Sequence, residues 1–108
     1  MTTFNDRERS YEAKFAHDEE LRFKATARRN RLLGQWAAEK LGLAGTSAED
    51  YIKDVIRADF KHPGDDDVVE KVLDDFKAKD VPVTDAELRA KLVEFMGAAV
   101  AEIDKKPR

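Results

Sequence analysis

The sequence predicts an all-α protein: a four-helix bundle-like domain with a long first helix and a mobile N-terminal arm. Apolar residues recur at spacings of three and four along four segments, and no stretch shows the alternation typical of a strand. The connections between the segments are about three to six residues long, which favours antiparallel neighbours in a bundle. A length of 108 residues suits one domain.

The first helical segment is too long for a compact domain of this size. From Asp6 to Leu41 there is no proline and no glycine except Gly34, and good helix formers predominate. A continuous helix over these residues would span about 54 Å at 1.5 Å per residue. A compact domain of this chain length has a diameter on the order of 34 Å. We therefore predict a domain at 19–108 whose first helix covers about 19–42.

Residues 1–18 form the predicted arm, which we expect to be disordered or fraying when free because it carries too few large apolar groups to offset the entropy of ordering. Phe4, Tyr11 and Phe15 are nevertheless spaced so that a helix would place them within about 40° of one another. Residues 1–31 hold eight Lys or Arg against six Asp or Glu, whereas the remainder holds twelve against seventeen. These features favour an arm that binds a partner protein.

The second helix is predicted over about 47–62. Thr46 and Glu49 have the spacing of a capping box at its start, and Pro63 disfavours helix in the residue before it. The third helix is predicted over about 66–79, and it ends near the Asp80-Val81-Pro82 stretch.

The fourth helix is predicted over about 85–104. Thr84 and Glu87 again have the spacing of a capping box. The apolar residues that follow recur at helical spacing and form a candidate core face: Leu88, Leu92, Phe95, Met96, Ala99, Val100 and Ile103.

Composition argues against several classes of protein. There is no cysteine, glycine-rich phosphate loop or catalytic motif, and two separate histidines do not make a zinc site, so we expect neither an enzyme nor a metal protein. A net charge of −3 argues against nucleic acid as a partner. No segment is long and apolar enough to enter a membrane, so we expect a cytoplasmic protein. The Asp65-Asp66-Asp67 run could hold a cation, but acidic residues are also typical of a helix N-terminus.

One dense basic cluster, Arg28-Arg29-Asn30-Arg31, allows two interpretations. Arginine side chains match phosphate and carboxylate groups in geometry, so Arg28, Arg29 and Arg31 could bind a nucleotide, a phosphate or an acidic partner. They could equally be the polar side of the long helix. Trp36, which follows on the same helix, is more simply a core residue than a ring that stacks on a ligand.

Several segments of the chain resemble the zeta subunit of alphaproteobacterial F-type ATP synthases. The resemblance runs continuously from residue 4 to residue 42, and its most distinctive block is Ala27 to Ala38. The matching segments are Phe4-x-Asp6-Arg7-Glu8-Arg9, Glu12-Ala13-Lys14-Phe15-Ala16-His17-Asp18, Phe23-Lys24, Ala27-Arg28-Arg29-Asn30-Arg31-Leu32-Leu33-Gly34-x-Trp36-Ala37-Ala38 and Leu41-Gly42.

The resemblance implies a four-helix inhibitor of ATP hydrolysis by the catalytic head of the synthase. Its N-terminal arm would insert as a helix into a catalytic interface of the head, next to the rotor stalk. The arm positions that match the family are Phe4, Arg7, Glu8, Tyr11, Lys14 and Phe15.

The resemblance also sets expectations about partners. The protein would be a monomer when free, would require no cofactor, and would associate with the cytoplasmic face of the membrane through ATP synthase. Two alternatives stay open. One is a nucleotide- or phosphate-binding helical sensor with weak ATP or ADP binding, and the other is a helical adaptor for another protein.

Overall fold

Four helices make up the part of the chain that the computed structural model describes, residues 19–59 and 64–105. They are α2 (Glu19–Lys40), α3 (Gly45–Asp59), α4 (Asp66–Ala78) and α5 (Asp85–Lys105). These residues include no strand, so the predicted all-α, four-helix fold is confirmed for them. The predicted arm at 1–18 lies outside the described residues.

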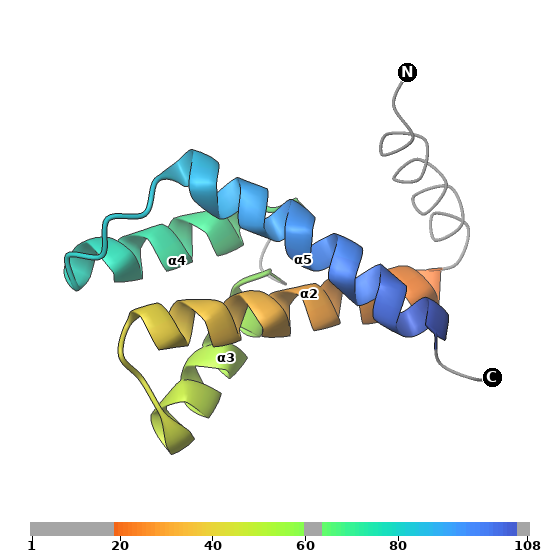
Figure 1. The fold of residues 1–108 in the computed structure, drawn as a ribbon, viewed down its shortest axis with the longest axis horizontal. Coiled ribbons are helices and arrows are strands. Elements are labelled where there is room, and N and C mark those ends of the chain that lie inside the picture. Colours follow the sequence, from red (N-terminus) through yellow and green to blue (C-terminus); the bar gives the residue numbers. More distant parts are fainter. Residues whose placement is uncertain (1–18, 60–63, 106–108) are drawn as a thin grey trace.

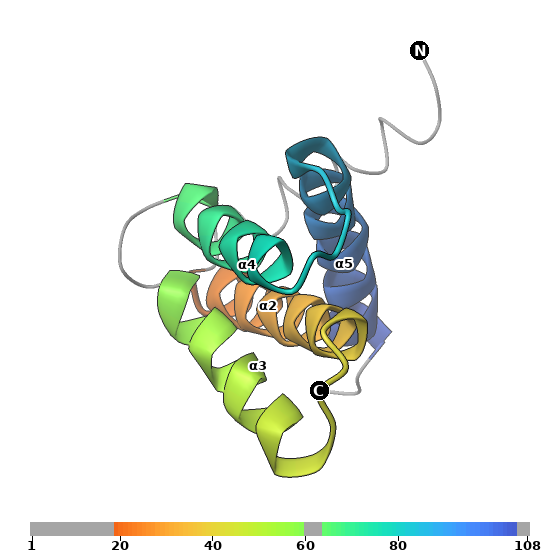
Figure 2. The same ribbon diagram turned by 90° about the vertical axis from the view of Figure 1, so that its left-hand side faces the viewer.

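The helix α2 is the centre of the arrangement. It packs most extensively on α3 and α5, and α4 contacts both α3 and α5 (Figure 2). The start of α2 and the end of α5 lie at the same end of the molecule (Figure 1). A segment that precedes α2 therefore joins the domain beside the end of α5.

The main core lies where all four helices meet. Phe76, Leu33 and Leu88 are its largest fully buried side chains. Burial of each such side chain contributes about 1.5–3 kcal/mol relative to exposure. Its buried members are Leu33, Ala37, Ala38, Tyr51, Val55, Val68, Val69, Val72, Phe76, Leu88 and Leu92.

A second, smaller apolar cluster joins the first half of α2 to the last part of α5. Ala25 and Val100 are its buried members, and Leu21, Met96 and Ile103 pack against them. The cluster shares no residue with the main core. The start of α2 is thus held by a contact of its own.

The connection from α2 to α3 begins with a Schellman motif. The N–H of Leu43 donates to the carbonyl of Ala38 at 2.9 Å, and Gly42 has a φ of 76°. A residue without a Cβ adopts this conformation at no steric cost. Asp80 has a φ of 58° at the corresponding position after α4, although it carries a side chain.

The two predicted capping boxes have different outcomes. At α5 the N–H of Glu87 donates to Thr84 Oγ1 at 3.1 Å, as predicted. The predicted cap at Thr46 is wrong, because α3 begins at Gly45 and Thr46 lies inside its first turn. Glu49 binds an arginine of α2 instead. The contact between Glu49 and Arg31 of α2 replaces the expected capping contact within α3.

The helices α2 and α3 approach each other closely at Gly34. A Cβ added to Gly34 would lie 3.1 Å from both Cα and Cγ1 of Ile52. This separation is shorter than ordinary van der Waals contact between carbon atoms. The absence of a side chain at Gly34 therefore sets the distance between the two helices.

Candidate functional site

The three arginines of the basic cluster each bind a different part of the molecule. Arg28 Nε lies 3.0 Å from Glu102 Oε2 on α5, and Arg31 Nη2 lies 3.3 Å from Glu49 Oε1 on α3. Both pairs are partly exposed. The arginines do not converge on one site, because each has a separate carboxylate partner.

Arg29 is the buried member of the cluster, with 5% of its surface exposed. Its Nη1 donates to Asp65 Oδ1 at 3.0 Å and its Nη2 donates to Asp59 Oδ1 at 3.4 Å. Asn30 Oδ1 accepts from both Nε and Nη2 of Arg29, at 3.1 and 2.9 Å. Asp59 ends α3 and Asp65 precedes α4, so Arg29 ties both ends of that connection to α2.

Trp36 packs against the main core. Its ring meets Phe76 edge to face at a centroid distance of 5.6 Å and Phe95 at 6.4 Å. The ammonium groups of Lys40 and Lys91 lie 5.5 and 5.7 Å from the Trp36 ring centroid. The ring is therefore already in contact with side chains of this chain.

The acidic run before α4 is divided between two basic partners. Asp65 binds Arg29, and Asp66 Oδ1 accepts from Arg89 Nη2 at 2.9 Å. The hydrogen bonds that Arg89 donates to Asp66 and Asp85 raise the pKa of Arg89. Within residues 19–59 and 64–105, no group of three or more His, Cys, Asp or Glu side chains is placed to hold a metal ion.

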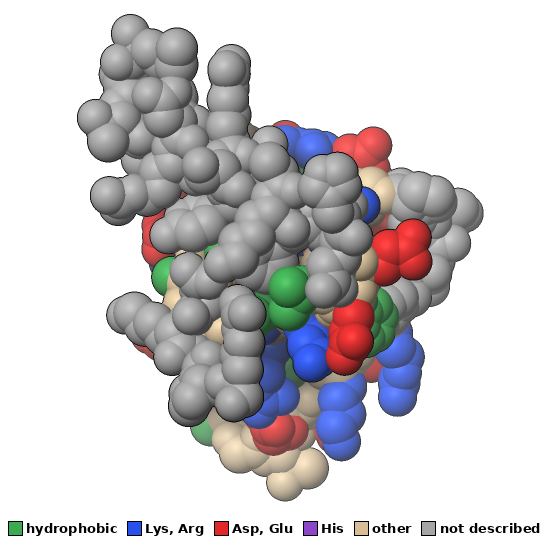
Figure 3. Space-filling model, turned by 90° about the vertical axis from the view of Figure 1, so that its right-hand side faces the viewer, with side chains coloured by type: hydrophobic (Ala, Val, Ile, Leu, Met, Phe, Trp, Pro, Cys, Tyr) green, Lys and Arg blue, Asp and Glu red, His purple; other side chains and the backbone are tan. Residues whose placement is uncertain are grey.

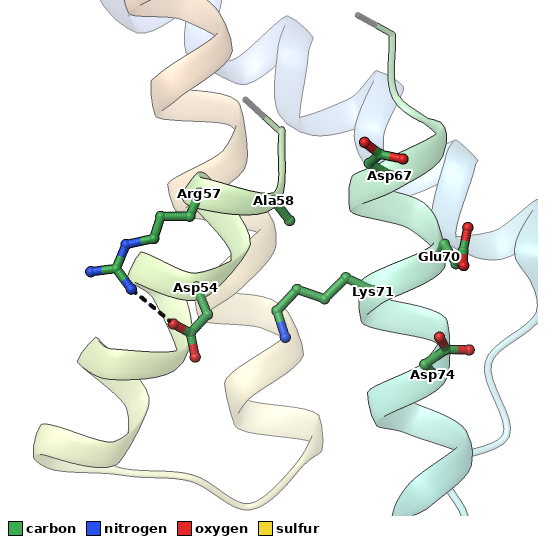
Figure 4. Close-up of a pocket in the computed structure, with 7 residues that line it drawn as sticks. All are labelled: Asp54, Arg57, Ala58, Asp67, Glu70, Lys71 and Asp74. Carbon is green, nitrogen blue, oxygen red and sulfur yellow. Dashed lines mark hydrogen bonds and ion pairs between the residues drawn. The ribbon is translucent and has the colours of Figure 1, made fainter. Parts of the chain in front are cut away.

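A groove of about 450 Å³ lies between α3 and α4, and the sequence interpretation did not foresee it. Lys71 extends from α4 toward α3, and Arg57 binds Asp54 across one turn of α3 at 3.4 Å (Figure 4). The lining residues are Asp54, Arg57, Ala58, Asp67, Glu70, Lys71 and Asp74. The helical spacing of the last four could have indicated one face of α4.

Three carboxylates of this groove, those of Asp67, Glu70 and Asp74, stand along α4 (Figure 4). Like charges at spacings of three and four in a helix are destabilising by about 0.2–0.5 kcal/mol per pair. Among the described residues, Glu70 and Asp74 have no hydrogen bond or ion pair. This side of the groove therefore carries negative charge that the described chain does not neutralise.

The hydroxyl of Tyr51 is buried, and the ring lies close to Lys71, which lines the groove. Tyr51 is 8% exposed, and the Lys71 ammonium, which binds Asp75 at 2.9 Å, lies 5.2 Å from its ring centroid. Burial above all, then a hydrogen bond with the Asp75 carboxylate and the charges of Asp75 and Asp54, raises the pKa of Tyr51 above its ordinary value of 10. The contact with Asp75 falls outside strict hydrogen-bond geometry, so this carboxylate satisfies the hydroxyl only weakly.

Large apolar groups are exposed at separate places. Phe23 on α2 is 57% exposed and Val93 on α5 is 56% exposed. At the end of the molecule where α2 begins, the described surface mixes side chains of both charges with some apolar ones (Figure 3).

The arm residues expected to bind a partner lie outside the described residues: Phe4, Arg7, Glu8, Tyr11, Lys14 and Phe15. What the structure does describe is the place where the arm joins the domain. That place is the start of α2 at Glu19, held by the small cluster of α2 and α5.

A solved structure and a protein family are similar to this chain. No curated protein matches the chain significantly. A protein solved by solution NMR matches it with a TM-score of 0.68 and 44% sequence identity, over 77% of this chain and 94% of that one. A protein-family model described as ATPase inhibitor subunit zeta matches residues 1–102.

The fold defines a small protein whose described residues form four helices. The chain belongs to the ATPase inhibitor subunit zeta family. Membership of this family supports a role as an inhibitor associated with ATP synthase and suggests a non-catalytic, regulatory protein. No helix among the described residues is long and apolar enough to cross a membrane.

Proposed function

We propose that this protein inhibits ATP hydrolysis by inserting residues 1–18, as a helix, into a catalytic interface of the F-type ATP synthase head, next to the rotor stalk. The observation that carries the proposal is the family match, which begins at residue 1 and therefore includes the arm. The docked helix would stabilise one rotary state of an enzyme that must pass through all of them.

The roles of the arm residues follow from their chemistry. Phe4, Tyr11 and Phe15 supply the apolar contacts, because aromatic side chains dominate binding energy at interfaces. Arg7 and Lys14 bind carboxylates of the head, and Glu8 contributes to orientation on the polar side of the helix. The free protein is a monomer that acts on the cytoplasmic side of the membrane.

Deletion of residues 1–18 tests this proposal. Both apolar clusters consist of residues from 21 onward, so the shortened chain should keep its helical circular dichroism and its cooperative unfolding. It should lose inhibition of ATP hydrolysis by isolated ATP synthase. A folded truncated protein that inhibits at the original concentration would refute the assignment.

The alternative of weak ATP or ADP binding at Arg28, Arg29 and Arg31, beside Trp36, requires arginines to leave carboxylates that they bind in this structure. Titration of ATP and ADP, monitored by backbone NMR shifts, distinguishes nucleotide binding from inhibition through the arm alone. Saturable changes confined to residues 28–36 would support a nucleotide site. An inhibitor that acts through its arm alone should show none.

A further inference from the structure

We propose that the contact between the first turns of α2 and the end of α5 is a helix template for the arm. The template holds residues 19–28 as a helix, from which residues 1–18 extend when they insert into the synthase. This inference rests on the proposed function and gives α5 a part in it. Arg28, Val100 and Glu102 are positioning residues, because they act on the arm through the first turns of α2.

The first turns of α2 pack on α5 separately from the main core. Ala25 is buried there against Val100 of α5. The first residue of α2 in the main core is Leu33, which lies eight residues beyond Ala25, about 12 Å along the helix axis. The contact with α5 can therefore form or open while the main core stays packed.

This contact stabilises the helical conformation of residues 19–28. Leu21, Ala25 and Arg28 contact α5 and are spaced by four and three residues, which places them on one face of α2 only while the segment is helical. Arg28 Nε donates to Glu102 Oε2 at 3.0 Å. Both the apolar packing and the ion pair are lost when the segment leaves the helix.

The sequence allows this helix to extend into the arm. Residues 1–33 contain no glycine and no proline, and residue 18 directly precedes α2. The first turn of an isolated helix is unfavourable by about a thousandfold, whereas each further residue adds at little cost. An arm that extends α2 therefore avoids the nucleation step when it inserts.

The template makes the potency of inhibition depend on α5. When residues 19–28 open from α5, insertion of the arm has to order them again. The apparent affinity for the synthase then falls in proportion to the fraction of molecules in which the template is formed. Destabilisation of the main core has no such effect while the domain stays folded.

A matched pair of double variants tests this dependence. The template variant, Val100→Ala with Glu102→Gln, removes a buried valine and a carboxylate that contact the start of α2. The control, Val55→Ala with Glu49→Gln, removes the same groups from α3, namely a valine of the main core and the partner of Arg31. Both variants keep the sequence of α2 and of the arm.

Inhibition of ATP hydrolysis by isolated ATP synthase is the first measurement, after circular dichroism has shown that both variants are folded. We expect the template variant to raise the concentration for half-inhibition by about threefold to tenfold, and the control to stay within about twofold of wild type. The single changes Glu102→Gln and Glu49→Gln, which leave both apolar clusters intact, should show the same order with a smaller difference. Equal potency of the template variant and the control would overturn the inference.

Amide hydrogen exchange in the free protein tests the template without the synthase. In the template variant, the amides of residues 23–28 should exchange faster than in wild type, by at least the factor that its potency loses, and those of residues 33–38 should keep their rates. The control should leave residues 23–28 unchanged. Wild-type exchange at residues 23–28 in the template variant would overturn the inference.

A rescue variant distinguishes a template from a general loss of stability. Thr26→Ala, added to the template variant, should recover about twofold to threefold of the potency, because alanine favours helix more than threonine and restores no contact with α5. Absence of any recovery would count against a helix template.

Deletion of residues 1–18 separates this inference from the proposed function. If the shortened protein still inhibits, the proposed function fails, and the template fails with it. If the deletion abolishes inhibition and the template variant and its control are equally potent, the template alone fails.

Discussion

Replacement of Arg29 by methionine should cost this protein a large part of its stability. Methionine keeps the apolar stem and removes the cation that faces Asp59 and Asp65. The Asp59 side chain is 10% exposed, so its charge would be left buried without compensation. The Asp65 side chain is 45% exposed and can be solvated instead. Asn30 would lose both hydrogen bonds to its oxygen.

The size of this stability loss follows from the exposed fractions of the Asp59 and Asp65 side chains. Removal of one partner of a buried ion pair costs about 3–5 kcal/mol. This range already includes the loss of the hydrogen bonds to the Asn30 oxygen, because removal of the same guanidinium group causes both losses. We expect a loss of about 3 kcal/mol, near the lower end, because only one of the two carboxylates is buried. Domains of this kind have total stabilities of about 5–15 kcal/mol.

Urea unfolding followed by circular dichroism measures this loss. With a denaturant dependence of about 1–3 kcal/mol per molar urea, the midpoint should fall by roughly 1.5 M. Arg31→Met is the matched control, since its pair with Glu49 is half exposed and should contribute at most about 1 kcal/mol. Addition of Asp59→Leu to Arg29→Met should recover part of the loss, because it removes the unpaired buried charge. If Arg29→Met costs no more than Arg31→Met, the reasoning is refuted.

Three other changes test separate features of the fold. Gly34→Ala should destabilise by about 1–2 kcal/mol in thermal unfolding, because its Cβ would lie 3.1 Å from the backbone of Ile52; a raised midpoint would show that α3 can move away. Asp80→Gly should stabilise by about 0.5–1 kcal/mol, since it relieves a φ of 58°, and an unchanged urea midpoint would contradict this. The pKa of Tyr51 is raised in the folded state, so stability should fall as the pH rises above about 10, where only the unfolded chain loses this proton. Tyr51→Phe should make that fall shallower, and identical slopes would count against the shift.

Much of the fold could be predicted from the sequence because helix periodicity is a local signal. Thr84 and Glu87 are three residues apart, and their capping contact depends on little else. Glu49 has the same spacing from Thr46, but it binds Arg31 on another helix. The spacing of residues along one helix does not show which side chains of other helices will bind them in the folded protein.

The candidate site was harder to predict for the same reason. Arg29 lies between Arg28 and Arg31 in sequence, and both interpretations of the cluster, a binding site or the polar side of the helix, treated the three arginines alike. Only the fold brings Asp59 and Asp65 to Arg29 and buries it with Asn30. The groove beside Glu70 likewise depends on how α3 and α4 are placed, which the periodicity of each helix does not specify.

The separation of the two apolar clusters along α2 has a mechanical consequence. Tension applied at Glu19 reaches the small cluster around Ala25 and Val100 before it reaches the main core. The first turns of α2 can therefore come away from α5 while Leu33 and Phe76 stay packed. The start of α2 can therefore loosen at Glu19, where the preceding segment is attached, without unfolding of the main core.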